Sequence, residues 1–211
     1  MLQCQIVPVS PFVQNCSIIW DDASKDAVII DAGGDADKIR QAVSQLGVNV
    51  KAIWLTHGHI DHISAVGDMV ESYAVPVIGP HKGDAFWIDG LADVCKKYGF
   101  PIAKPVTVTQ WLNHGDSLSL GEYDFEVRHV PGHSAGHVIF YCAKVNTAWV
   151  GDTIFQGSIG RTDLPTGDLD TLLNAIREQL FSLPDNTQCI SGHGNPTTIG
   201  QEKRFNPFLK A

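Results

Sequence analysis

Strand-length apolar runs alternate with helical patterns along this 211-residue chain, and this alternation most constrains the fold. The runs in the first half have the usual length of strands and read CQIVPV, NCSIIW, DAVIID and AIWLTH. Before the last of them, helical spacing relates Ile39, Ala42, Val43 and Leu46. Asp35 or Asp37 is available to cap this helix, and Gly47 to end it. The first half therefore predicts a sheet with a helix between two of its strands.

The second half repeats this scheme. Its predicted strands are YDFEVRHV, HVIFYCA, TAWVGD and TQCISGH, and LDTLLNAIREQLFSL predicts a strongly periodic helix. Two further helices are predicted through VGDMVESY and from about Lys82 to Lys97. Sheets in the middle with helices outside predict an αββα sandwich formed by residues 1–211 as one domain. A doubly wound α/β sheet fits the same pattern.

Composition excludes several classes of protein. With 44% hydrophobic residues, the chain can bury a sizeable core. The net charge of -8 repels phosphate backbones and anionic lipids, and no run approaches the length of a membrane span. Five cysteines without a CxxC pair predict reduced, buried thiols and no disulfide framework. We expect a cytoplasmic protein without a nucleic-acid or membrane partner, and no protein partner is implied.

The segment Thr56–His62 places three imidazoles and a carboxylate directly after the apolar run AIWL. Because alternate residues of an extended segment point to the same side, His57 and His59 can bind one ion together with a third nitrogen donor from elsewhere. Asp61 and His62 follow in the next turn, where they can bind a second ion about 3.5–4 Å away. The segment therefore predicts a site for two metal ions.

Three more candidate ligands lie in similar surroundings. They are His133 in VPGHSAGH, Asp152 in WVGDTIF and His193 in ISGHGNP, each at or just after the end of an apolar run. An isolated HxH pair is more often a pair of unrelated surface histidines, but that interpretation does not explain so many matching positions. The other histidines are expected to have structural roles and no metal: His81, His114, His129 and His137.

The motifs HGHIDH, PGH, GD and GH, in this order, resemble the ligand signature of the metallo-β-lactamase superfamily over nearly the whole chain. The resemblance implies an αββα sandwich with metals in a groove at one edge. It implies three ligands for the first ion: His57, His59 and His133. It implies three for the second: Asp61, His62 and His193. Asp152 would bridge the ions, and Asp31 in IIDAGG matches an early Asp that supports the site without binding metal.

Several branches of this superfamily fit the ligand pattern poorly. Flavodiiron proteins carry a carboxylate where His59 stands, and true β-lactamases lack the bridging aspartate that Asp152 supplies. RNA-processing members usually carry a large inserted domain, for which this uninterrupted chain has no room. None of these activities is therefore expected.

The segments GDTIFQGSIGRTDLPTGD and SGHGNPTTIGQEKRFNPF resemble the short type II glyoxalase-like hydrolases of bacteria. This resemblance implies hydrolysis of S-lactoylglutathione or a related hydroxyacylglutathione, a small-molecule thioester. The longer glyoxalase II enzymes have an additional C-terminal helical region that helps to hold glutathione, whereas only about eighteen residues follow His193 here. The difference bears on substrate affinity more than on the reaction.

The expected chemistry is attack by a metal-bound hydroxide on the thioester carbonyl. A water on one zinc ion already has a pKa of about 7, so hydroxide is available at neutral pH. Asp61 is expected to orient this nucleophile, and no serine or cysteine nucleophile is needed. We expect two divalent ions per chain, zinc first, although iron and manganese also suit nitrogen and oxygen ligands.

Two other classes remain open at this point. Persulfide dioxygenases share the fold, the ligand motifs and GRTD, but use a single iron on two histidines and an aspartate. The chain would then oxidise glutathione persulfide. The second alternative is a metal-binding module without turnover, which fits less well because no metal position is substituted.

Candidate contacts to the thiol part of the substrate are basic residues. Arg161 in GRTD stands where the glyoxalase II enzymes that the chain resembles have a glutathione-binding lysine, although their tyrosine is not kept. Because glutathione carries carboxylates and the protein is acidic, Arg161, Lys203 and Arg204 are the expected substrate-binding cations. Alternatively, all three are ordinary solvated surface charges.

Overall fold

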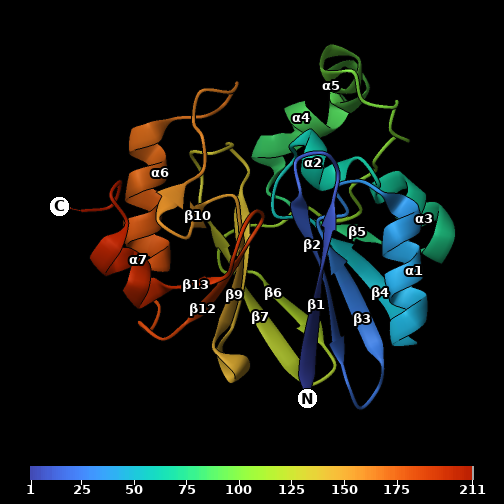
Figure 1. The fold of residues 1–211 in the computed structure, drawn as a ribbon, viewed down its shortest axis with the longest axis horizontal. Coiled ribbons are helices and arrows are strands. Elements are labelled where there is room, and N and C mark those ends of the chain that lie inside the picture. The colour runs from blue at the N-terminus through green and yellow to red at the C-terminus, as the bar shows by residue number, and fades with distance from the viewer. Residues whose placement is uncertain (211) are drawn as a thin grey trace.

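Two β-sheets pack face to face in the computed structural model, which describes residues 1–210. Helices cover the outer face of each sheet (Figure 1). The expected αββα sandwich is confirmed. The doubly wound alternative is wrong, because the strands divide between two sheets instead of forming one.

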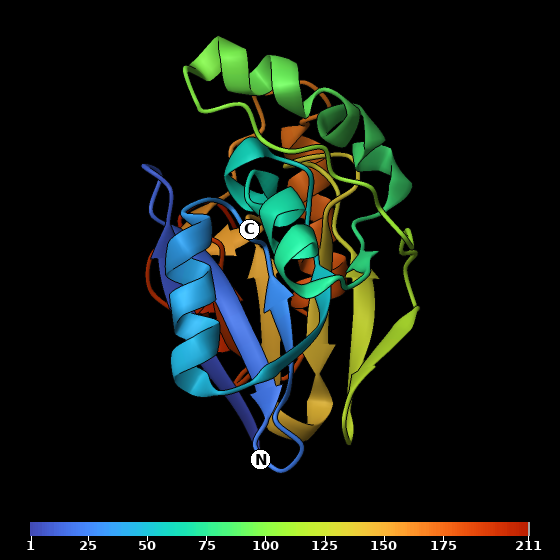
Figure 2. The ribbon, with the colours of Figure 1, turned by 90° about the vertical axis from the view of Figure 1, so that its right-hand side faces the viewer.

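The first sheet has five strands in chain order. They are β1 (Leu2–Val9), β2 (Gln14–Asp21), β3 (Asp26–Ile30), β4 (Asn49–Trp54) and β5 (Val77–Ile78). The first three pair antiparallel, whereas β3, β4 and β5 run parallel to one another. A parallel pair needs a crossover, which α1 (Ala36–Leu46) supplies between β3 and β4. α1 and α3 (Val66–Tyr73) lie on the outer side of this sheet (Figure 2).

The second sheet has six strands. Their order is β13 (Thr197–Thr198), β12 (Gln188–Ser191), β9 (Thr147–Gly151), β8 (Val138–Cys142), β7 (Tyr123–His129) and β6 (Ser117–Leu120). Only β12 and β9 pair in parallel, and α6 (Leu169–Ala175) lies in the connection between β9 and β12. α6 and α7 (Ile199–Phe205) cover the outer face (Figure 1). A small hairpin of β10 (Ile154–Phe155) and β11 (Ser158–Ile159) follows β9.

Short helices lie in the connections from β4 to β5 and from β5 to β6. They are α2 (Ile60–Ile63), the 3₁₀ turn η1 (Lys82–Asp84), α4 (Ala85–Asp89) and α5 (Leu91–Tyr98). A further 3₁₀ turn, η2 (Ala143–Val145), joins β8 to β9. No helix among residues 1–210 is long and apolar enough to cross a bilayer.

Two of the sequence-based helix predictions need correction. The helix expected from about Lys82 to Lys97 is broken at Gly90 into α4 and α5. The long helix of the second half is α6 followed by one π turn, η3 (Ile176–Leu180). Asp35, one of the two expected caps, is the N-cap residue of α1, although its carboxylate accepts from the Ser10 backbone N–H at 3.0 Å instead of from the first turn of the helix. Gly47 ends α1 as expected, in the left-handed conformation with φ 62°.

An aromatic cluster joins the two sheets. The Trp54 ring on β4 packs edge-on against Phe125 of β7, with ring centroids 4.9 Å apart, and lies 5.3 Å from the Phe140 ring of β8. All three side chains are buried. Rings in such edge-to-face contact stabilise a core beyond the area they bury. Because Trp54 precedes the histidine loop by two residues, the same contacts anchor the start of that loop.

We predict that Phe125→Ala destabilises the protein by about 3–5 kcal/mol, because it leaves a cavity between the sheets. Denaturant unfolding of the metal-free protein measures this. The control is Phe205→Ala, whose side chain is 67% exposed and should change the free energy of unfolding by no more than about 0.5 kcal/mol. A loss below about 1 kcal/mol in Phe125→Ala would show that the two sheets do not depend on this cluster.

Candidate active site

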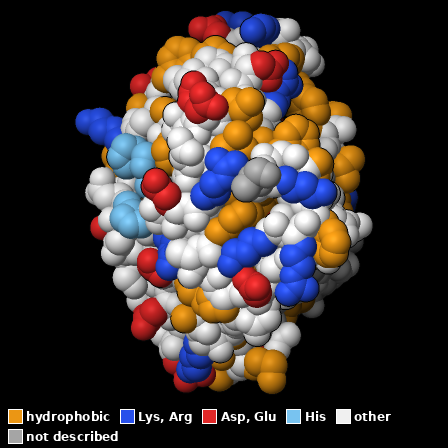
Figure 3. Space-filling view, turned by 90° about the vertical axis from the view of Figure 1, so that its left-hand side faces the viewer, with side chains coloured by type: hydrophobic (Ala, Val, Ile, Leu, Met, Phe, Trp, Pro, Cys, Tyr) orange, Lys and Arg blue, Asp and Glu red, His pale blue; other side chains and the backbone are white. Residues whose placement is uncertain are grey.

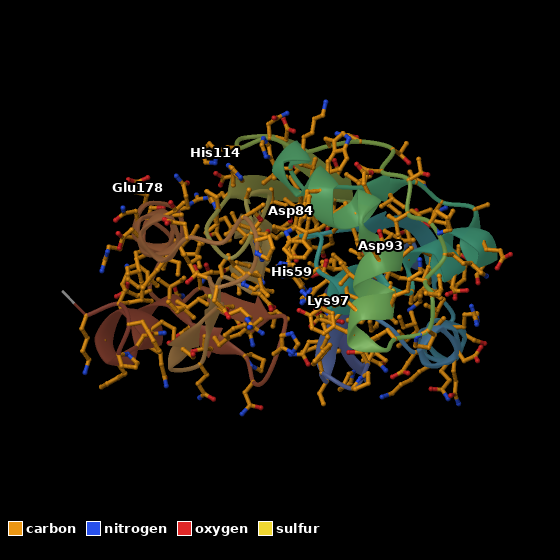
Figure 4. All side chains as sticks on the ribbon, turned by 90° about the horizontal axis from the view of Figure 1, so that it is seen from above. His59, Asp84, Asp93, Lys97, His114 and Glu178 are labelled. Carbon is orange, nitrogen blue, oxygen red and sulfur yellow. The ribbon has the colours of Figure 1, made fainter. Side chains whose placement is uncertain are left out.

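The predicted ligands meet at the edge of the sandwich where strands of both sheets end. The first loop follows β4, and the second connects β7 to β8. Asp152 directly follows β9, and His193 follows β12 by two residues. Seen from above, His59 lies between the two halves, with Asp84 and α5 close by (Figure 4). Residues distant in the sequence therefore share one site because their strands end together.

Three groups of side chains are close enough to hold a metal ion; one of them, Asp31 with His57 and His62, shares a histidine with each of the other two. In the first of these other two, one ligand atom each from His57, His59 and His133 lie within 4.8 Å of one another. In the second, atoms of Asp61, His62 and His193 satisfy the same limit. These are the two sets expected from the sequence.

The Asp152 carboxylate lies between the two groups. Its Oδ1 is 3.3 Å from Nε2 of His62, and its Oδ2 is 3.5 Å from Nε2 of His193 and 3.7 Å from Nε2 of His133. One carboxylate thus faces histidines of both groups, as a bridging ligand must. The glycine before His193 makes room for it, since a Cβ on Gly192 would lie 2.1 Å from Oδ1 of Asp152.

Hydrogen bonds behind the first loop set the tautomers of two histidines. Nδ1 of His62 donates to Oδ2 of Asp31 at 2.9 Å. Nδ1 of His57 lies 3.0 Å from Oγ1 of Thr56, which itself donates to Asp31 at 2.6 Å. Both imidazoles therefore direct the lone pair of Nε2 toward the site. Asp31 thus contacts His62 directly and His57 through Thr56.

Backbone carbonyls set the tautomers of the histidines in the other two loops, His133 and His193, by accepting from their Nδ1 atoms. Nδ1 of His133 donates to the Arg161 carbonyl at 2.7 Å, and Nδ1 of His193 donates to the Phe12 carbonyl at 3.1 Å. The free Nε2 of His133 faces Nδ1 of His59, 2.9 Å away. Converging lone pairs of this kind are the arrangement that a cation requires.

Buried atoms without a hydrogen-bond partner show that these residues fit divalent ions. They include Nε2 of His57 and His62 and Oδ1 of Asp152. A buried polar atom without a partner is costly, and several around one volume call for a ligand that binds them all. Imidazole nitrogens with carboxylate oxygens form a donor set that suits zinc, iron or manganese. The residues therefore fit the expected metals.

Burial keeps three of the imidazoles neutral. It lowers the pKa of His57 well below its ordinary value, lowers that of His59 to about 3, and also lowers that of His133. Neutral imidazole is the form that binds metal, so these histidines need lose no proton at neutral pH.

The second group is charged. Burial opposes protonation of His62, but the nearby carboxylates of Asp152 and Asp61 raise its pKa well above the ordinary value. Burial likewise opposes ionisation of Asp61, but the neighbouring His62 and the hydrogen bond from His193 lower its pKa. Without metal, a shared proton on an imidazole partly compensates the carboxylates. A divalent ion would replace that proton.

Asp84 is a buried carboxylate that our sequence analysis did not identify. It accepts from the backbone N–H of Gly58 at 2.8 Å, from Oγ of Ser134 at 2.7 Å and from the backbone N–H of Gly136 at 2.5 Å. It therefore joins the loop of His57 and His59 to the loop of His133. The sequence carried no signal for this role, because Asp84 lies inside a segment that reads as an ordinary helix.

His137 is a second supporting residue. Its Nε2 accepts from the Asp152 backbone N–H at 3.0 Å, and its ring stacks on His57 at 4.7 Å. Burial lowers its pKa well below the ordinary value, so the ring stays neutral and remains an acceptor. His129 lies apart, with Nε2 donating to the Ala135 carbonyl at 2.8 Å. His81 and His114 lie near His129 and outside both groups.

A cavity of about 550 Å³ opens onto the candidate ligands. Its walls are mainly apolar and include Trp87, Tyr98 and Leu164. Arg161 also lines it and is the one Lys or Arg side chain among the lining residues. The guanidinium of Arg161 forms two hydrogen bonds of 2.8 Å with Asp163.

Lys203 and Arg204 lie elsewhere. Both belong to α7, and neither lines the cavity. Lys203 pairs with Asp185 at 2.7 Å on the outer face. Figure 3 shows that face, where several Lys and Arg side chains gather near the C-terminus. Lys203 and Arg204 are thus outside the cavity that contains the candidate ligands, and only Arg161 is retained as a proposed substrate contact.

An αββα sandwich with paired groups of imidazoles and carboxylates at one sheet edge defines a class of metalloprotein. The metallo-beta-lactamase superfamily matches residues 9–193, and the chain belongs to this superfamily.

Individual relatives are similar over nearly the whole chain. The chain is 43% identical to hydroxyacylglutathione hydrolase GloC of Haemophilus influenzae over 211 residues, which cover 100% of this chain and 99% of the relative. The BLEG-1 B3 metallo-beta-lactamase structure matches with a TM-score of 0.91 and 38% identity over 100% of both chains. The di-iron-bound form of TTHA1623 matches with a TM-score of 0.89 and 36% identity, covering 97% of this chain and 100% of the other. Together these findings support a hydrolase.

We predict that Asp84→Ala lowers metal affinity by about 10–100-fold, because two ligand loops lose their common acceptor. Competition with a chelator, followed by metal analysis, measures the affinity. The control is Asp89→Ala, which removes an exposed carboxylate five residues further along the chain. Equal affinities for both variants would contradict a positioning role for Asp84.

We predict that purified wild-type protein holds about two metal ions per chain and that Asp61→Ala holds about one fewer, because Asp61 belongs to the second group alone. Elemental analysis after dialysis measures the ratio. Asp93→Ala removes an exposed carboxylate on α5 and serves as the control. A wild-type protein with one ion at full activity, unchanged by Asp61→Ala, would overturn the two-ion assignment.

Proposed function

We propose that the protein is a metal-dependent thioester hydrolase that acts on S-lactoylglutathione or a related hydroxyacylglutathione. The observation that carries this proposal is the meeting of both ligand groups at the floor of one open cavity of about 550 Å³. A thioester can enter such a cavity and place its carbonyl beside the ligands. The 43% identical relative named hydroxyacylglutathione hydrolase GloC supports the choice of substrate.

Two divalent ions are proposed. The first would be held by His57, His59 and His133, and the second by Asp61, His62 and His193. Asp152 would lie between them. Zinc remains the first choice. The similarity to a di-iron-bound structure supports iron as the alternative. Bound ions would supply hydroxide at neutral pH and polarise the substrate carbonyl.

The protein's own groups prepare the reaction. Asp61 keeps a lowered pKa and therefore stays ionised, so that its carboxylate can accept a hydrogen bond from the attacking water and orient it. Hydrolysis joins the water oxygen to the acyl carbon, breaks the carbon–sulfur bond and transfers a proton to the departing thiolate. The apolar walls, including Trp87 against the His59 ring at 4.6 Å, limit the access of other water.

We predict that metal-loaded wild-type protein hydrolyses S-lactoylglutathione and that Asp152→Ala loses about 100-fold or more of kcat, because the carboxylate common to both groups is gone. Loss of the reactant's thioester absorbance measures turnover. His129→Ala removes a histidine outside both groups and should retain most of the activity. High turnover in reconstituted Asp152→Ala would refute the proposed mechanism.

A second candidate, β-lactam hydrolysis, is favoured by the 38% identical structure of a B3 metallo-beta-lactamase. The bridging position of Asp152 argues against a true β-lactamase, whereas this similarity supports one. The same preparation should therefore be assayed with a chromogenic cephalosporin. Faster turnover of the cephalosporin would favour this candidate. Oxygen uptake with glutathione persulfide would instead point to the dioxygenase class.

Arg161 is the proposed contact to the glutathione carboxylates. We predict that Arg161→Ala raises KM for S-lactoylglutathione more than it lowers kcat, since the contact lies away from the reacting carbonyl and is made in the ground and transition states alike. Arg177→Ala, which removes an exposed arginine of η3, is the matched control. A KM within about twofold of wild type would show that Arg161 does not contact the substrate.

A further inference from the structure

A second groove, of about 630 Å³, lies beside the cavity of the candidate metal centre. Phe12 and Tyr98 line both of them. The groove is formed by the turn between β1 and β2, the start of α1, the turn from α2 into the start of α3, and the end of α5 with the segment after it. None of the candidate metal ligands lines it. The groove is thus a continuation of the cavity and lies outside the metal centre.

Phe12 connects the groove directly to that centre. Its carbonyl accepts the hydrogen bond from Nδ1 of His193, while its ring stacks on Phe100 of the groove with centroids 5.5 Å apart and planes 18° from parallel. A molecule that reaches the ligands can therefore extend along the Phe12 ring into the groove.

The groove is apolar and lacks cations. Much of its wall is apolar: Pro11, Phe12, Ala65, Tyr98, Phe100 and Ile102. Three of these side chains leave large areas exposed, 48% for Phe12, 48% for Tyr98 and 58% for Ile102. The charged residues among its lining are Asp35 and Asp68; Asp68 pairs with Lys104 at 2.7 Å, and no Lys or Arg itself lines the groove. An uncharged hydrocarbon suits these walls, whereas a carboxylate would meet like charge.

We propose that this groove binds the acyl part of the substrate and that the protein prefers apolar acyl chains longer than lactoyl. This inference rests on the proposed thioester hydrolase function. A thioester carbonyl at the metal centre divides the substrate into two arms. The glutathione arm carries carboxylates and is complementary to Arg161, which lines the cavity and not the groove. The acyl arm then extends past Phe12 and Tyr98 and contacts the apolar wall of the groove.

A series of S-lactoyl-, S-butanoyl-, S-hexanoyl- and S-octanoylglutathione tests the inference with the metal-loaded protein. Because each methylene that leaves water for an apolar wall adds binding free energy, we expect kcat/KM to rise along the series and to be about tenfold or more higher for octanoyl than for lactoyl. Hydrolysis of the lactoyl ester without any rise along the series would overturn the acyl site and leave the proposed function intact. If no member of the series is hydrolysed, both the acyl site and the proposed thioester hydrolase function are overturned.

Ile102→Glu tests the position of the chain. The change adds a third carboxylate to the groove at a side chain that is already exposed, so folding should be little affected. We expect the octanoyl-to-lactoyl ratio of kcat/KM to fall by about fivefold or more, and Ile102→Leu to restore it. The matched control, Leu169→Glu, alters a 47% exposed leucine of α6 outside the groove and should keep the wild-type ratio. An unchanged ratio in Ile102→Glu, or an equal fall in Leu169→Glu, would refute the proposal.

Discussion

The Asp31 carboxylate joins the ends of β3 and β4 to the histidine loop. It accepts from the Thr56 backbone N–H at 2.8 Å, from Oγ1 of Thr56 at 2.6 Å and from Nδ1 of His62 at 2.9 Å. To do so, its backbone adopts the left-handed region with φ 56°, which is unfavourable for a residue other than glycine. The hydrogen bonds in return direct two imidazoles into the site. The candidate metal centre therefore depends on a strained residue that lies outside the two proposed ligand sets.

The sandwich supplies the rigidity that such a centre needs. Packing of Trp54 between Phe125 and Phe140 holds the two sheets together directly beneath the histidine loop. Asp84 adds a second connection, from the loop after β4 to the loop before β8. Ligands on different loops keep a common geometry only when both kinds of support are present. Core packing and buried hydrogen bonds thus both hold the loop that carries His57 and His59.

The two halves of the site differ in electrostatics. Burial lowers the pKa of His57, His59 and His133, whereas the carboxylates of Asp152 and Asp61 raise the pKa of the neighbouring His62. The cavity over these residues has apolar walls and a single arginine, Arg161. The adjoining groove extends this cavity away from Arg161. A substrate with one anionic arm and one apolar arm is complementary to this distribution of charge.

The sequence by itself determined the order of strands and helices and, through the HGHIDH, PGH, GD and GH motifs, the resemblance that implies the sandwich and the candidate ligands, because these are local patterns. It also indicated Arg161. The choice between a sandwich and one doubly wound sheet was made only by the packing of the strands. Only the tertiary structure placed Asp84 and His137 behind the ligands and separated Lys203 and Arg204 from the cavity. The groove past Phe12 was likewise invisible, since its walls come from four distant segments. Contacts between residues far apart in the chain arise only when the sheets pack, and no local pattern encodes them.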